Sequence, residues 1–179
     1  APTESVLARE ASEDVWALSV HAKDIAGNAT GDYITIALSE DATSSFKFGE
    51  DEFDIPNPSS ASMIDMYIDN SDWMGTKDVN GVGVYMPYFF KDVKSTNYDE
   101  YEAWNISADK YNVENAIELS WNAPVEFDAD VSLIVDGEVI DMKVETSVEI
   151  DNAENMTIVV GNVNSFLNPV PENFALSSA

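Results

Sequence analysis

The chain has 179 residues, of which 34 are Asp or Glu and 8 are Lys or Arg, so its formal net charge is -26 at pH 7. This charge argues against nucleic acid and anionic membrane surfaces as partners, because both require clustered cations. The chain has no Cys, which excludes disulfides and thiolate metal sites, and it has no apolar run long enough to insert across a membrane.

Alternation of apolar and polar residues predicts strands along most of the chain. Asp136-Gly137 is a typical two-residue hairpin turn, whereas the stretch 46–58 ends in two prolines and is expected at a sheet edge or in a long connection. An aromatic stretch covers 85–90. In chain order, the expected strands are 15–21, 33–38, 63–68, 101–108, 116–121, 131–135, 138–142, 144–150 and 156–160.

Short strands with turn residues between them predict an all-β fold: an antiparallel β-sandwich, jelly-roll or Ig-like, with few or no helices. The length suits one domain, which we place at 15–161. We expect an N-terminal arm at 1–14 and an extended C-terminal tail or linker at 162–179. Trp16, Trp104 and Trp121 are expected in the core.

Residue chemistry indicates no catalytic site. His21 is the only histidine, so a Ser-His-Asp triad would have to include it, and it lies mid-strand with no motif around it. No phosphate-binding loop, nucleophile elbow or zinc-binding helix motif is present. With 34 acidic residues, two carboxylates at glycosidase spacing would arise by chance. We therefore expect a protein that is not an enzyme.

Acidic residues crowd one loop-like run, at Glu50, Asp51, Glu52 and Asp54. Calcium prefers such hard oxygen ligands, so these four residues are the candidate metal site, although no EF-hand pattern is present. A solvated acidic loop that keeps the protein soluble in salty surroundings is the alternative. We expect no cofactor beyond a structural calcium ion.

Exposed aromatic rings offer a second kind of binding site. Trp73, Tyr85 and Tyr88 fall near predicted turns, where they are candidates for stacking on sugar rings. The alternatives are that alternate rings fill the core or form a protein interface.

Several segments resemble the β-sandwich domain that precedes the C-terminal sorting domain in cargo proteins of the type IX secretion system of Bacteroidota and related phyla. The end, 171–176 (PENFAL), looks like the linker before such a sorting domain. The resemblance implies an extracellular or cell-surface location and a chain processed at both ends. The matching segments are 16–20, 41–43 with Phe46, 50–58, 117–121 and 133–143.

These observations lead to two hypotheses for function. The first is a non-catalytic structural or adhesive protein, a self-associating surface or filament subunit whose terminal segments add strands to a neighbour's sheet edge. The second is a carbohydrate-binding module of a secreted protein. Disordered arms are the alternative reading of both termini. The residues expected to mediate self-association are Val6, Leu7, Phe166, Leu167, Phe174 and Leu176.

Overall fold

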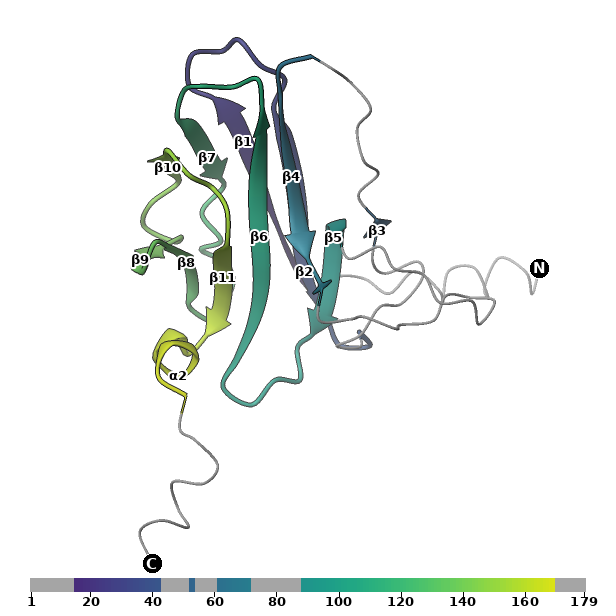
Figure 1. The fold of residues 1–179 in the computed structure, drawn as a ribbon. Helices are drawn as coiled ribbons and strands as arrows, with labels where there is room; N and C mark the ends of the chain where they lie inside the picture. The colour runs from purple at the N-terminus through teal and green to yellow at the C-terminus, as the bar shows by residue number, and fades with distance from the viewer. Residues whose placement is uncertain (1–14, 43–51, 54–60, 72–87, 170–179) are drawn as a thin grey trace, which may run out of the picture.

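A computed structural model describes residues 15–42, 52–53, 61–71 and 88–169, and these form a nearly all-β structure with one short helix (Figure 1). The all-β expectation is thus confirmed for this part of the chain. The elements are β1 Trp16–Asp24, β2 Asp32–Ser39, β3 Glu52–Phe53, β4 Met63–Asp69, β5 Tyr88–Ser95, β6 Tyr101–Tyr111, β7 Ile117–Trp121, β8 Val131–Val135, β9 Glu138–Asp141, β10 Ser147–Ile150, β11 Met156–Gly161 and α2 Val163–Leu167.

The strands form a single mixed sheet with the order β10-β7-β1-β2-β5-β4-β6-β11-β8-β9, and β3 pairs with β5 off this path. All of these pairs are antiparallel except β2–β5, which is parallel from Thr35 opposite Lys91 to Ser39 opposite Ser95. The expectation of a purely antiparallel sheet was therefore wrong at this pair. Alternation along a strand does not report the direction of its neighbour, and β5 reaches β2 only through a crossover.

The sheet curls, because the strands at its two ends are consecutive in the chain. Only residues 142–146 separate β9 from β10, so the two edges must approach one another, and both lie on the same side in Figure 1. Met142 links the ends of the curl. Its N–H donates to Val131 O at the start of β8 (2.9 Å), and its carbonyl accepts from Trp121 Nε1 at the end of β7 (3.0 Å).

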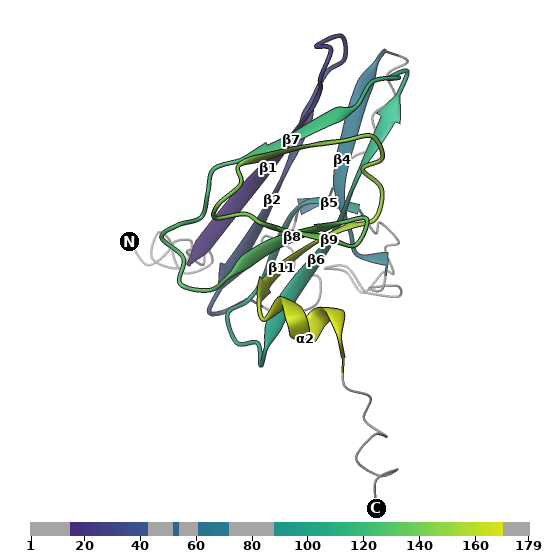
Figure 2. The same cartoon turned by 90° about the vertical axis from the view of Figure 1, so that its left-hand side faces the viewer.

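Figures 1 and 2 show the curl of the sheet. The main hydrophobic core lies on its inner side. The alternating strands place every second side chain there, as on β1, where Leu18, Val20 and Ala22 are buried. The expected core positions Trp104 and Trp121 are confirmed, with 1% and 5% of their surface exposed. Trp16 is only partly buried and packs against the margin of this core.

The hairpin between β8 and β9 confirms the turn predicted from Asp136-Gly137. Both residues have positive φ, 49° and 81°, as a two-residue turn of this type requires. The strands on either side pair from Val135 opposite Glu138 to Ser132 opposite Asp141. A local dipeptide signal was sufficient here because the turn geometry depends on these two residues alone.

Strands β2 and β4 start side by side and then separate to admit β5. At their starts, Thr30 N donates to Ser62 O (3.1 Å) and Ile64 N donates to Thr30 O (2.9 Å). The next donor, Met66 N, bonds instead to the side chain of Asp32, at Oδ2 (2.8 Å). Asp32 thus satisfies the last backbone donor of the β2–β4 contact where the strands diverge.

The segment after β11, expected to be extended, begins with a short helix. Asn162 caps α2, its Oδ1 accepting from Ser165 N (3.2 Å), and the ring of Phe166 meets Tyr101 edge-on with centroids 5.4 Å apart. Gly161 precedes the cap with φ +98°, and a Cβ there would lie 2.6 Å from Glu100 O. The cap, the glycine and the ring contact together account for the helix at 163–167. Of the tail beyond this helix, the structure describes only residues 168–169.

Replacing Asp32 tests its role at the divergence of β2 and β4. Asp32→Ala leaves Met66 N–H without its acceptor, and we expect a loss of about 1–3 kcal/mol in the free energy of unfolding. Asp32→Asn keeps an acceptor oxygen and should lose clearly less. Urea unfolding followed by tryptophan fluorescence measures both, and equal stability of Asp32→Ala and the parent chain would contradict this role.

Candidate functional site

Strand β1 is paired on both sides over only part of its length. It pairs with β2 from Trp16 to Ala22, but with β7 only from Val20 to Asp24. Within the described structure, its first four residues, Trp16 to Ser19, therefore have no neighbouring strand on the β7 side. They form an open sheet edge about 13 Å long, at roughly 3.3 Å per residue.

The backbone groups at this edge are those of Ala17 and Ser19. In an antiparallel ladder, alternate residues direct their N–H and C=O groups to opposite neighbours. Ile25 N donates to Ala116 O on the β7 side (3.1 Å), so the odd-numbered residues of β1 direct their backbone toward β7. Ala17 and Ser19 belong to this set but lie beyond the end of β7, and their backbone groups face the gap.

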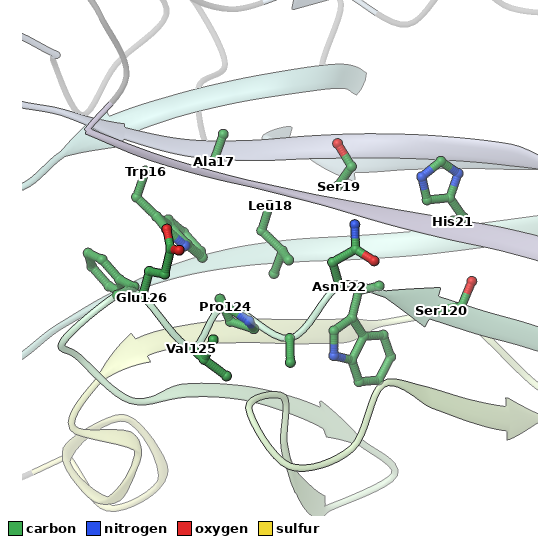
Figure 3. Close-up of a pocket in the computed structure, with 13 residues that line it drawn as sticks. Trp16, Ala17, Leu18, Ser19, His21, Ser120, Asn122, Pro124, Val125 and Glu126 are labelled. Atoms are coloured by element: carbon green, nitrogen blue, oxygen red, sulfur yellow. The ribbon is translucent and has the colours of Figure 1, made fainter.

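A groove of about 610 Å³ occupies this gap, between β1 and the loop 122–127 (Figure 3). The side chains of Trp16 and Leu18 point from β1 toward the loop, whereas those of Ala17, Ser19 and His21 lie on the other side of the strand. The side chains of the loop that line the groove belong to Asn122, Ala123, Pro124, Val125, Glu126 and Phe127.

The far wall of the groove is held at both ends. At one end, Trp121 is buried and its indole bonds to Met142 O (3.0 Å). At the other, Phe127 stacks on Trp16 with centroids 4.8 Å apart, and its carbonyl accepts a hydrogen bond from Lys143 Nζ. The groove is therefore preformed, which lowers the entropic cost of binding an extended segment.

The groove combines apolar and polar residues and is almost uncharged in a strongly acidic protein. Glu126 is the single charged residue in its described lining. The two strands at the ends of the sheet differ from it: β9 and β10 have four residues each and carry exposed acids, Glu138 and Asp141 on β9 and Glu149 on β10. Short, charged edges resist strand addition. The open part of β1 is equally short, but Trp16 to Ser19 carry no charged side chain.

A second cluster, of charged groups, lies inside the curl. Because Asp92 pairs with Ile36 and Lys94 with Leu38, both charged side chains share the core face of the sheet, and they are 0% and 8% exposed. Asp92 Oδ2 accepts from Asn70 Nδ2 (3.1 Å) and lies 3.7 Å from Lys94 Nζ, whereas Asp92 Oδ1 has no hydrogen-bond partner.

Glu102 faces this interior cluster from β6. Burial raises the pKa of its carboxyl above the ordinary 4.5, the nearby Lys94 ammonium opposes that rise, and Asp92 adds to it. The lysine supplies positive charge among carboxylates, which disfavours a metal ion at the same place. No group of three His, Asp or Glu side chains able to hold a metal is found among the described residues. We interpret the interior cluster as structural.

The residues predicted from sequence fall unevenly on the structure. Of the metal candidates Glu50, Asp51, Glu52 and Asp54, only Glu52 belongs to the described part, where it is exposed on β3 opposite Lys91. Of the sugar-binding candidates, Trp73 and Tyr85 lie outside it. Tyr88 begins β5, is 42% exposed and contacts Tyr67, with ring centroids 4.3 Å apart.

The self-association candidates divide similarly. Phe166 and Leu167 lie in α2, whereas Val6, Leu7, Phe174 and Leu176 lie outside the described residues. The acceptor edge on β1 was not predicted, because the alternation along β1 does not show where the neighbouring strand β7 ends. The proline at position 124 was the available signal, since it cannot donate to a ladder.

Comparison of the chain with protein-family models, curated proteins and solved structures gives no match. Within the described ranges, none of the helical structure is both long and apolar enough to cross a membrane.

Replacing Glu102 tests how the interior cluster couples to pH. A carboxyl whose pKa is raised by folding stabilises the folded state in acid. This contribution is lost as the pH rises from the pKa of the unfolded chain, near 4.5, through the higher pKa of the folded state. Glu102→Gln should therefore become progressively more stable than the parent chain across that rise. Thermal unfolding against pH measures this, with Glu138→Gln on β9 as the control for general charge. A difference independent of pH would contradict the raised pKa.

Proposed function

We propose that this domain is a non-catalytic structural or adhesive protein of the cell exterior, which self-associates by accepting an extended segment of a second copy at the open edge of β1. The observation that carries the proposal is the uncharged edge Trp16 to Ser19 beside a preformed and nearly uncharged groove. An added strand would bond to the backbone of Ala17 and Ser19 and would continue β7 along β1.

The donor we propose is the segment around Phe174 and Leu176. In an extended strand these two residues share one face, with Ala175 on the other. That spacing suits a groove whose apolar wall lies on one side of the added strand. Val6 and Leu7 are neighbours and would face opposite ways, and Phe166 and Leu167 are held in α2, so these four residues suit the groove less well.

Charge makes the association depend on conditions. At a net charge of -26 the copies repel one another, and the groove is one of the places where they can approach without opposing acids. Salt screens such repulsion over about 8 Å at physiological ionic strength, and divalent cations do so more strongly. We therefore propose that high salt or calcium favours the assembled form, with no dedicated calcium site required.

Two further expectations from the sequence accompany this proposal. The resemblance of 171–176 to a type IX linker supports a location outside the cell. The close approach of β9 and β10 supports interpreting the curled sheet as a β-sandwich, with β10-β7-β1-β2 facing β6-β11-β8-β9.

A matched pair of valine variants tests the groove. Val125 lines the groove and is 69% exposed, whereas Val144 is 74% exposed and does not line it. Val125→Glu places an unpaired charge against the incoming strand and should weaken self-association by about tenfold or more, whereas Val144→Glu should not. Sedimentation velocity in high salt and in calcium measures both. A parent chain that stays monomeric under all these conditions overturns the proposal.

The tail is tested in the full-length chain. Phe174→Ser with Leu176→Ser removes the apolar face of the donor and should abolish assembly, whereas Ser177→Ala with Ser178→Ala should leave it intact. A free peptide of residues 171–179 should dissociate the oligomers by competing for the groove, and a peptide with the two apolar residues changed should not. Unchanged assembly of the Phe174/Leu176 variant would show that this segment is not the donor.

A further inference from the structure

The outer face of β4, β6 and β11 is a polar surface distinct from the groove. The register places Asp69 opposite Tyr88 and Thr157 opposite Asn105, and the β4–β6 register continues to bring Asp69 beside Asn105. One row of side chains therefore crosses four neighbouring strands, β5, β4, β6 and β11. At about 4.8 Å between strands, the row is roughly 14 Å long.

A hollow of about 450 Å³ lies along this row, with Asp69, Asn105, Asn155 and Thr157 in its lining. Tyr67 and Tyr88 lie next to it on β4 and β5, their rings 4.3 Å apart and tilted by 40°. These six residues, Tyr67, Asp69, Tyr88, Asn105, Asn155 and Thr157, are called the amide platform below.

Within the described structure, the two platform amides, Asn105 and Asn155, keep open hydrogen-bonding groups, whereas Asp69 Oδ1 accepts from Ser71 N (2.9 Å). Asn105 Oδ1 accepts from Thr157 Oγ1 (3.3 Å), which leaves Asn105 Nδ2 as an open donor. Asn155 is exposed with φ +57°, and its backbone N–H bonds to Ser107 Oγ (3.1 Å), which fixes the turn that presents its amide. Within the described structure, the side-chain amide of Asn155 makes no hydrogen bond.

The aromatic side of the platform is also held in place. Tyr67 OH donates to Asp109 Oδ1 (3.4 Å), and burial, followed by the negative charge of Asp109, raises the pKa of Tyr67. The hydroxyl thus stays protonated and the ring keeps its position. Tyr67 in turn contacts Tyr88, a residue that is 42% exposed. A supported, exposed ring is a ready stacking surface.

We propose that the amide platform binds a neutral polysaccharide. Sugar hydroxyls both donate and accept hydrogen bonds, which matches a row of amides, a hydroxyl and a carboxylate, and the apolar face of a sugar ring can stack on Tyr88. Asp69 and Asp109, on a chain of net charge -26, repel uronate or sulfate groups, so the ligand is an uncharged glycan.

Affinity electrophoresis of the full-length chain tests the proposal, with barley β-glucan, galactomannan and xyloglucan as neutral probes and polygalacturonate as an anionic one. At least one neutral glycan should retard the parent chain. Tyr88→Ala and Asn105→Ala should each weaken that binding by about tenfold, as expected for the loss of one stacked ring or one well-placed hydrogen bond. Tyr111→Ala, which removes another exposed tyrosine from the end of β6, is the matched control and should bind like the parent chain.

Two variants separate folding and assembly from binding. Tyr67→Phe keeps the ring but loses the hydrogen bond to Asp109. This variant should fold like the parent chain and bind the glycan more weakly. Val125→Glu should bind the glycan normally, because the β1 groove is not involved. The proposal is overturned if no neutral glycan retards the parent chain, or if polygalacturonate alone does so. Wild-type binding by folded Tyr88→Ala and Asn105→Ala would overturn it as well.

Discussion

The short connection between β9 and β10 is the constraint on which the rest of the structure depends. These strands lie at opposite ends of the sheet, yet only residues 142–146 join them, so the sheet must close around its core. Met142 holds the closure by bonding to Val131 on one side and to the Trp121 indole on the other. Without this closure the apolar face of a sheet this wide would be open to water.

The same closure produces the β1 groove. Because the Trp121 indole bonds to the β9–β10 connection, the chain leaves β1 at this point instead of continuing the β1–β7 ladder. Phe127 then packs back on Trp16, and the loop between them stands away from the strand. An open edge beside a loop held at Trp121 and Phe127 is thus a consequence of how the sheet closes.

The described surfaces of this molecule differ in charge. Acids on β9 and β10 protect the short outer edges, the β1 groove is nearly uncharged, and the amide platform combines neutral amides with a supported tyrosine. The ion pair of Lys94 with Asp92 lies inside the curl. These differences underlie the two proposals, a strand at the β1 groove and a neutral glycan at the amide platform.

Local pattern was enough to predict most of the strands. The alternation on β1, β7 and β8 and the Asp136-Gly137 turn depend on residues close together in the chain, so they are visible in the sequence. Strand β5 was not among the expected strands, because 85–90 reads only as an aromatic stretch and the charged residues Asp92 and Lys94 interrupt the apolar pattern after it. Their partners inside the curl accommodate these charges.

The amino-acid sequence by itself determined the all-β class, the hairpin and the acidic surface, because period-two alternation, a positive-φ turn and net charge are properties of neighbouring residues or of composition. Tertiary structure alone decided the parallel β2–β5 pair, the half-paired edge of β1 and the row from Tyr88 to Thr157. These features depend on which strands become neighbours, and strand pairing joins residues far apart in the chain that no local pattern relates.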